Sequence, residues 1–318
     1  MSEHEFEIIE RYFKVISKSS AGVVLGPGDD CAVLAFPGDT EVCVSTDTLI
    51  EEVHFPANCS AAMVASRLVG SNLSDLAAMG AVPHSCLIAM TMPEADPGWL
   101  AEFSETLSQL IDQYGLSLVG GNISRGELSL TMTVLGTVPV GEALTRQGAR
   151  PGDSIYVTGT LGDAGQGLTH LLSGRDPGGF LTSRYRTPTP RLEAGCQLRG
   201  IATAMIDISD GLVADLGHLC RESQVGAVVE LTSVPVSDDL VAALGDVEAR
   251  CLALTAGDDY ELCFTAPGEA MKRLRPLAEA SRLQITQVGR IGSDGGIDVL
   301  DAEGNCVEIG NPGYLHFS

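Results

Sequence analysis

The sequence predicts a mixed α/β protein of the α+β class, built from two domains. Its 318 residues exceed the ~250 to 300 residues at which a single core usually stops growing. Apolar runs typical of strands alternate with helical segments in both halves. A polar stretch rich in Gly, Arg and Pro, at residues 141–153, separates the two series. We therefore expect an N-terminal domain over residues 1–140 and a C-terminal domain over residues 141–318.

The N-terminal half begins with a predicted helix. Residues 3–17 place Phe6, Ile9, Phe13 and Ile16 at helical spacing. Apolar runs bounded by turn residues then predict strands, and longer segments predict helices. The strands are expected at 31–36, 41–49, 84–92 and 127–138, and the helices at 60–80 and 97–114.

The C-terminal half repeats this alternation without a short-period repeat. Five apolar runs predict strands, and two segments between them predict helices. The strands are expected at 154–160, 202–209, 226–231, 251–257 and 260–266, and the helices at 162–173 and 211–224.

The composition excludes several classes of protein. Hydrophobic residues make up 44% of the chain and charged ones 19%, so a sizeable core is expected. The net charge of −23 argues against nucleic-acid partners, which need clustered Lys and Arg, and against an anionic membrane surface. The acidic N-terminus is unlike a secretory signal, and no apolar run reaches the ~18 residues of a membrane span.

The nine cysteines form no C-x-x-C pair and leave an odd count, which argues against a zinc site or a disulfide framework. We expect reduced thiols and a cytoplasmic location.

Four separate segments each carry an Asp next to Gly, Ser or Thr. Each acid alone could be a helix cap or a turn residue. Turn chemistry accounts for one acid per turn, however, and not for all four segments together. Hard oxygen donors suit Mg²⁺, Mn²⁺ or Ca²⁺, and Mg²⁺ usually binds together with substrate phosphates. The segments are GPGDD (26–30), STDT (45–48), NLSDLAAMG (72–80) and DISDG (207–211).

Candidate phosphate contacts are less distinct. The sequence lacks the G-x-x-x-x-G-K-[ST] motif, so a P-loop is excluded. Backbone N–H groups of glycine-rich residues 119–126 and 157–167 could face an anion, and Arg125, Arg146 and Arg150 could bind phosphate oxygens. Residues 119–126 could equally form a plain turn between two strands, and residues 157–167 a strand-to-helix connection.

Eight motifs, taken in order, resemble those of the thiamine-monophosphate kinases, within the aminoimidazole-ribonucleotide synthetase superfamily. The resemblance implies the two-domain fold of that superfamily, with an N-terminal metal- and ATP-binding domain whose sheet pairs in a homodimer. It also implies Mg²⁺-dependent transfer of the γ-phosphate of ATP onto thiamine monophosphate, giving thiamine diphosphate. The motifs are GPGDDCAVL, STDTLIEEVHF, NLSDLAAMGA, LVGGNISRG, ALTRQGARPGD, IDISDGL, GDDYELCFT and GYLHF.

The resemblance assigns roles to individual residues, with no catalytic group beyond the metal ligands. The implied metal ligands are Asp30, Ser45, Thr46, Asp47, Asp75, Asn122, Asp207 and Asp210. The implied ATP contacts are Gly121, Asn122, Arg146 and Ser209. The implied contacts to thiamine monophosphate are His54, Asp258 and Tyr314.

Two residues depart from the family pattern. Asn122 stands where the family usually has Asp, and Asp258 where it usually has Glu. Two rival hypotheses remain. One is another reaction of the superfamily, and the other is a non-catalytic protein that binds Mg²⁺ or Ca²⁺. The wide separation of the acidic segments favours metals shared with a substrate.

Overall fold

The computed structural model describes residues 5–17, 21–27, 31–174 and 178–314. The chain divides into two compact units. Unit 1 consists of Met1–Leu76 and Ala81–Gly141, and unit 2 consists of Ala77–Gly80 and Glu142–Ser318. Both units combine helices and sheets, which confirms the mixed α/β class.

Unit 1 is built on a four-stranded sheet. Its strand order is β3 (Thr40–Ile50), β6 (Ser129–Pro139), β4 (Val82–Met92) and β5 (Leu118–Arg125). β6 runs antiparallel to both of its neighbours, whereas β4 and β5 are parallel. Alternate residues of β6 are buried, as expected for a sheet covered on one face.

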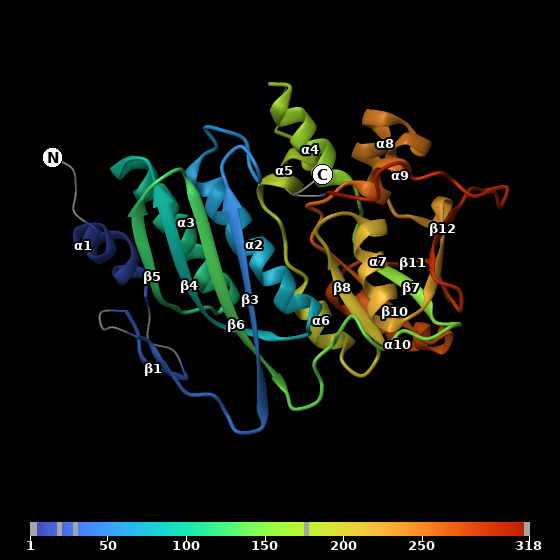
Figure 1. The fold of residues 1–318 in the computed structure, drawn as a ribbon, viewed down its shortest axis with the longest axis horizontal. Coiled ribbons are helices and arrows are strands. Elements are labelled where there is room, and N and C mark those ends of the chain that lie inside the picture. The colour runs from blue at the N-terminus through green and yellow to red at the C-terminus, as the bar shows by residue number, and fades with distance from the viewer. Residues whose placement is uncertain (1–4, 18–20, 28–30, 175–177, 315–318) are drawn as a thin grey trace. The chain divides into compact units, whose positions relative to one another are not determined.

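Two long helices, α2 (Ala61–Ala78) and α3 (Pro97–Tyr114), cover that face (Figure 1). α3 has the predicted bounds because Asp96 caps its N-terminus by accepting from the Gly98 N–H, and Gly115 ends it in a left-handed conformation.

The N-terminal segment is helical but is not the single α-helix that the periodicity predicts. It consists of α1 (Glu5–Ile8), a π-helical turn (Ile9–Phe13) and a 3₁₀ turn (Lys14–Ile16). The adjacent aromatic residues Tyr12 and Phe13 are both buried, which a widened turn accommodates. The strand predicted at 31–36 is reduced to β2 (Val33–Leu34), which pairs with β1 (Val23–Leu25).

Unit 2 is built on a six-stranded sheet. All neighbouring strands are antiparallel except β12 and β9. The order is β12 (Gly296–Leu300), β9 (Gly226–Glu230), β11 (Ile285–Gly292), β7 (Ser154–Thr158), β10 (Glu261–Ala266) and β8 (Ala204–Ile208).

Helices cover both faces of this sheet. Ile155 and Val157 of β7 share a buried cluster with Leu216 of α7 (Leu212–Ser223). Tyr156, between them, belongs to a second cluster with helices α6 (Leu192–Leu198) and α10 (Met271–Ser281). Since successive strand residues point to opposite faces, unit 2 has three layers.

The remaining helices of unit 2 are short, and one of them corrects a prediction. They are α4 (Asp163–Leu172), α5 (Phe180–Arg186), α8 (Asp238–Leu244) and α9 (Asp246–Thr255), with 3₁₀ turns at Leu231–Ser233 and Gly268–Ala270. The strand predicted at 251–257 is wrong, because most of this run belongs to α9. Ala249 and Ala253 are both buried, four residues apart, and the helix begins upstream of the apolar run.

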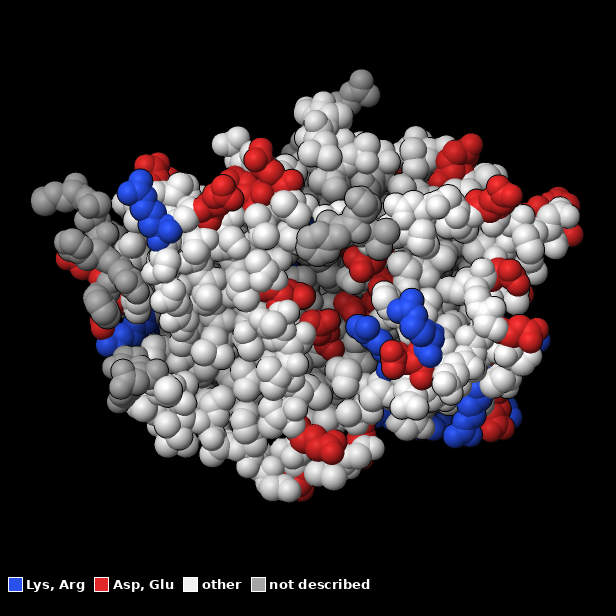
Figure 2. Space-filling view, in the orientation of Figure 1, with Lys and Arg blue, Asp and Glu red and all other residues white. Residues whose placement is uncertain are grey.

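Acidic side chains outnumber basic ones over the face in Figure 2, in keeping with the charge of −23. Among the described residues, no helix combines the length and the apolar character that a membrane crossing requires.

Candidate active site

Strand β3 carries three predicted metal ligands on its two faces. Ser45 and Asp47 are half-buried, whereas Thr46, between them, is exposed. The Thr46 hydroxyl donates to the carbonyl oxygen of Met132 at 3.0 Å. Ser45 and Asp47 therefore lie on one face of the sheet, and Thr46 lies on the other.

Helix α2 faces Ser45 and Asp47 with polar side chains. The Ser45 Oγ donates to Oδ2 of Asp75 at 2.5 Å, and the Asp47 N–H donates to Oδ1 of Asn72 at 3.2 Å. Asn72 is fully buried and donates in turn to the Leu68 carbonyl oxygen at 2.8 Å. Because Asn72 and Asp75 are three residues apart, they share one helix face. The structure thus brings together Ser45 and Asp75, two of the predicted ligands.

His54 lies in the turn that follows β3. Its Nδ1 accepts from the Ile50 N–H at 3.0 Å, and its carbonyl oxygen accepts from Arg67 Nη2 at 3.1 Å. The accepting Nδ1 requires the neutral ring to carry its proton on Nε2. His54 is therefore held at the end of the strand that carries Ser45 and Asp47.

Gly121 and Asn122 lie within β5, so residues 119–126 form neither a plain turn nor a phosphate-binding loop. Gly121 pairs with Ile88 of β4, and a side chain at position 121 would collide with the Ile88 carbonyl oxygen. This glycine is thus required by strand packing. Gly121 and Asn122 line a largely apolar cavity of about 830 Å³. Asn122 Nδ2 donates to Ser124 Oγ at 3.1 Å.

Asp30 lies outside the described residues. Within the part of the chain that the structure describes, no three His, Cys, Asp or Glu side chains form a group that could hold a metal ion. The carboxylates predicted as ligands therefore do not form a closed, all-protein cage there.

Three segments of unit 2 that are far apart in sequence meet beside the end of β8. Asp207 is buried in β8, and Ser209 and Asp210 follow the strand. The Asp258 N–H donates to the Ser209 carbonyl oxygen at 2.8 Å, and the Tyr314 N–H donates to the Asp210 carbonyl oxygen at 3.1 Å. Predicted metal, ATP and substrate contacts are thus joined by backbone hydrogen bonds.

A buried carboxylate, not identified from the sequence, fixes the segment 209–211. Oδ2 of Asp215, in the first turn of α7, accepts from the N–H groups of Ser209, Asp210 and Gly211 at 3.0, 3.0 and 3.1 Å. Burial raises the pKa of Asp215 to about 7, although these N–H groups lower it. An acidic residue in the first turn of a predicted helix, just after DISDG, is the signal that could have identified it.

Arg146 lies apart from Ser209 within unit 2. Its carbonyl oxygen accepts from Oγ of Ser223, the last residue of α7, at 2.8 Å. Gly211 immediately precedes the same helix. The two ends of α7 are about 18 Å apart at 1.5 Å per residue. The main chains of Arg146 and Ser209 are therefore separated by about the length of α7, and any shared contact with ATP would have to involve the long Arg146 side chain.

Comparison with known proteins identifies the family. Residues 28–138 match the AIR synthase related protein, N-terminal domain, and residues 150–302 match the corresponding C-terminal domain. The thiamine-monophosphate kinase of Salmonella typhimurium strain LT2 is 41% identical over 321 residues, covering 99% of this chain and 98% of the relative. That of Escherichia coli strain K12 is 40% identical over 319 residues, with 99% and 98% coverage.

Solved structures agree with this assignment. The thiamine-monophosphate kinase of Stenotrophomonas maltophilia K279a has a TM-score of 0.87 and 40% identity, covering 96% of this chain and 99% of its own. AaThiL complexed with AMPPCP and TMP has a TM-score of 0.77 and 30% identity, with 98% and 97% coverage. The hydrogenase maturation protein HypE, at 20% identity and a TM-score of 0.77, shares the fold. The chain belongs to the thiamine-monophosphate kinase family of AIR synthase related proteins.

Proposed function

We propose that the chain transfers the γ-phosphate of ATP directly onto thiamine monophosphate, producing ADP and thiamine diphosphate in thiamine diphosphate biosynthesis. The observation that carries the proposal is the junction beside β8. There Ser209, Asp210, Asp258 and Tyr314 are joined through backbone hydrogen bonds. These residues match the ATP, metal and substrate contacts implied by the family motifs. The relative AaThiL, 30% identical, is complexed with AMPPCP and TMP.

The oxygen-rich donor set fits Mg²⁺. Ser45 Oγ and Asp75 Oδ2 approach to 2.5 Å, and Asp47 lies two residues further along the same face of β3. Bound Mg²⁺ supplies positive charge that reduces the repulsion between ATP and a phosphate monoester. Asp30, Asn122, Asp207 and Asp210 are the further ligands in this proposal, whereas the Thr46 side chain lies on the opposite face of β3 and is not one of them. These carboxylates would hold the ions, and the ions would supply the charge that lets the two phosphates approach, so no protein nucleophile is required.

The organic part of the substrate needs different contacts. Thiamine monophosphate carries a cationic thiazolium and an aminopyrimidine, so carboxylate and aromatic side chains suit it. Asp258 supplies the carboxylate, and Tyr314, which is 46% exposed, supplies a ring available for stacking. His54 is the third contact, on unit 1. Gly121, Arg146 and Ser209 are assigned to ATP.

We also propose a homodimer that forms through the sheet of unit 1. Val42 and Val44 of β3 are 40% and 62% exposed, on the face opposite the half-buried Ser45 and Asp47. Leu87 of β4 is 36% exposed. An apolar sheet face of this kind is suited to pairing with a second copy. A cytoplasmic location is part of the proposal, because all nine cysteines are free thiols.

The test is a product assay. Purified protein is incubated with ATP, Mg²⁺ and thiamine monophosphate, with and without excess chelator, and the products are separated by chromatography. Equal amounts of ADP and thiamine diphosphate, lost with chelator, are expected. Consumption of ATP only with a different acceptor would assign the chain to another reaction of the superfamily. Tight metal binding without any turnover would support the non-catalytic alternative.

A further inference from the structure

The loop that carries Asp258 has an unusual backbone. Asp258 and Tyr260 have φ angles of 69° and 51°, in the left-handed region that residues other than glycine seldom adopt. Two such residues within three positions are unfavourable unless the surrounding structure holds them in place. Strained backbone of this kind is concentrated at functional sites.

Backbone hydrogen bonds hold the loop against β8. The Tyr260 N–H donates to the Ile208 carbonyl oxygen at 2.8 Å, and the Asp258 N–H donates to that of Ser209 at the same distance. Gly257 packs so closely on Ser209 that a side chain there would collide with its carbonyl oxygen. The path of the loop is therefore fixed directly beside the predicted nucleotide contact.

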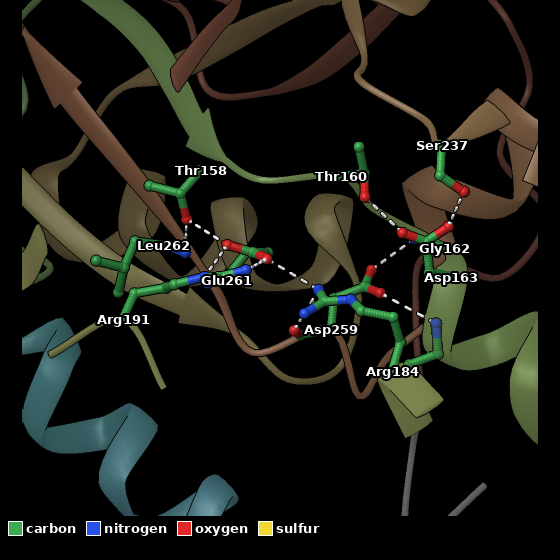
Figure 3. A network of polar contacts seen from close by, with 11 residues as sticks. Thr158, Thr160, Gly162, Asp163, Arg184, Arg191, Ser237, Asp259, Glu261 and Leu262 are labelled. Carbon is green, nitrogen blue, oxygen red and sulfur yellow. Dashed lines mark hydrogen bonds and ion pairs between the residues drawn. The ribbon is translucent and has the colours of Figure 1, made fainter. Parts of the chain in front are cut away.

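Asp259 points away from this pairing, into the interior of unit 2. It is 1% exposed and accepts from the N–H of Gly162 at 2.7 Å and from that of Ala164 at 3.4 Å (Figure 3). These N–H groups lie at the N-terminus of α4, where they have no partner within the helix and bond to the Asp259 side-chain oxygens instead. Arg184 Nη2 donates to the Asp259 carbonyl oxygen at 3.1 Å. Asp259 thus fastens the loop to α4 and α5.

Glu261 fixes the other side of Tyr260. Its carboxylate is fully buried and forms an ion pair with Arg184 at 2.8 Å and another with Arg191 (Figure 3). It also accepts from the Thr158 hydroxyl at 2.7 Å. The strained residue Tyr260 is thus flanked on both sides by buried, hydrogen-bonded carboxylates.

Within the loop, Tyr260 contacts the predicted substrate residue. The Tyr260 hydroxyl donates to Oδ1 of Asp258 at 3.1 Å, and the Tyr260 side chain is 7% exposed. A buried ring has few rotamers, so its hydroxyl restricts where the Asp258 carboxylate can lie. In this chain Asp258 is one methylene shorter than the usual Glu, which makes its placement more demanding.

We propose that Tyr260 and Asp259 are positioning residues for substrate binding. Tyr260 orients the Asp258 carboxylate toward the electropositive part of thiamine monophosphate, and Asp259 holds the left-handed backbone that brings the two side chains together. This inference rests on the proposed function and concerns affinity for the phosphate acceptor, not for ATP.

The principal test is Tyr260→Phe, which removes only the hydroxyl. The KM for thiamine monophosphate is expected to rise about tenfold, from the loss of one hydrogen bond to a charged group. The kcat and the KM for ATP are expected to stay within about twofold, since neither depends on Asp258. The matched control is Tyr156→Phe, because Tyr156 is buried against Phe264 in the core of unit 2. This control is expected to leave both KM values unchanged.

Asp259→Ala tests the backbone anchor, and Asp259→Asn tests rescue. The Ala variant is expected to raise the KM for thiamine monophosphate at least as much as Tyr260→Phe. Asn retains an oxygen for the Gly162 N–H, so it is expected to recover most of the affinity. Asp163→Asn is the control for stability. Asp163 accepts hydrogen bonds from Thr160 and Ser237 at 2.5 Å each. The substitution Asp163→Asn should therefore lower thermal stability without changing either KM.

The outcomes separate this inference from the proposed function. Wild-type activity together with an unchanged KM for thiamine monophosphate in Tyr260→Phe would overturn the inference alone. Equal changes in kcat and both KM values in Asp259→Ala, tracking a lower Tm, would also overturn it, because they indicate only a structural role. Absence of thiamine diphosphate from the wild-type assay would overturn both.

Discussion

The candidate site residues of the two units are positioned in different ways. In unit 1, Ser45, Asp47 and Asp75 lie on a strand and a helix, so the element that carries each residue determines its direction. In unit 2, Ser209, Asp210 and Asp258 lie on loops that two buried acids hold in place. Asp215 of α7 holds residues 209–211, and Asp259 anchors its own loop to Gly162. The conformation of these loops consequently depends on buried side chains, Asp215 and Asp259, that do not themselves contact a substrate in the proposed site.

Because of this difference, a substitution in unit 1 should change mainly the charge of the proposed metal site, whereas a substitution in unit 2 should change the stability of the fold. In unit 1, a proposed ligand such as Asp75 can lose its charge while the sheet and helix stay folded, because regular backbone hydrogen bonds hold these elements. In unit 2, the buried acids Asp215 and Asp259 maintain the backbone itself, and burial raises their pKa values to about 7 and about 8. Substitutions in the two units should therefore have distinguishable effects on rate and on folding.

The largest effect is expected from Asp75→Asn in unit 1. If Asp75 holds Mg²⁺ as proposed, removing its negative charge should lower kcat about 1000-fold. The Tm should change by less than about 2 °C, because Asn can still accept from Ser45 and α2 is otherwise unaltered. Steady-state kinetics and thermal unfolding measure the two quantities. A near-normal kcat would contradict the assignment of Asp75 to the metal site.

Asp215→Ala should behave differently, because it removes a backbone anchor in unit 2. Three N–H groups lose their shared acceptor, which should lower the free energy of unfolding by about 3 kcal/mol. The KM for ATP should rise about tenfold as Ser209 moves. Urea unfolding and kinetics test both, with Asp215→Asn, which keeps an acceptor oxygen, as the control. Unchanged stability in the Ala variant would show that the comparison between the units is wrong.

The pH dependence of stability should reveal the buried acids of unit 2. The pKa of Asp259 rises from 3.8 to about 8 because of burial, with Asp163 and Glu261 also raising it and Arg184 opposing them. The folded state therefore binds this proton more tightly than the unfolded state. Its contribution to stability is complete below about pH 4 and is lost as the pH rises through about 8.

Urea unfolding at about pH 5, 7 and 9 checks this expectation. The free energy of unfolding should fall over this range in the wild type. It should fall less in Asp259→Asn, which has no proton to lose. Identical slopes for the two proteins would mean that Asp259 does not contribute in this way. Burial also raises the pKa of Asp163, so some of the slope should persist in the variant.

The sequence was most informative where periodicity and capping act together. The predicted bounds of α3 match the structure, in which Asp96 caps the first turn and Gly115 ends the helix. The strand at residues 118–125 was not predicted, because Gly120 and Gly121 suggested a loop. In the structure, the close approach of β4 requires a glycine at position 121. A short apolar run such as 251–257 does not distinguish a strand from the end of a helix.

The order of the motifs suggested which residues belong to the candidate site, but not which contacts hold those residues in position. Asp258 and Tyr260 both have positive φ angles, and although Asp adopts this conformation more readily than most residues, nothing in the local sequence predicts it for Tyr260. The sequence placed Asp259 only within the motif GDDYELCFT, because its partners at Gly162 and Ala164 are almost a hundred residues away in sequence. Long-range backbone contacts of this kind need the three-dimensional fold.

The smallest effect is expected at Tyr314, where side chain and backbone can be tested separately. Tyr314→Ala removes a half-exposed ring but keeps the N–H that donates to Asp210, so only stacking is lost. The KM for thiamine monophosphate should rise about fivefold, with kcat and the KM for ATP unchanged. Gly313→Ala alters the backbone instead, because a side chain there would collide with the Asp210 carbonyl oxygen and with Ala214. It should affect the KM for ATP as well. If Tyr314→Ala leaves the KM for thiamine monophosphate unchanged, the ring makes no substrate contact, and the segment serves unit 2 only through its backbone.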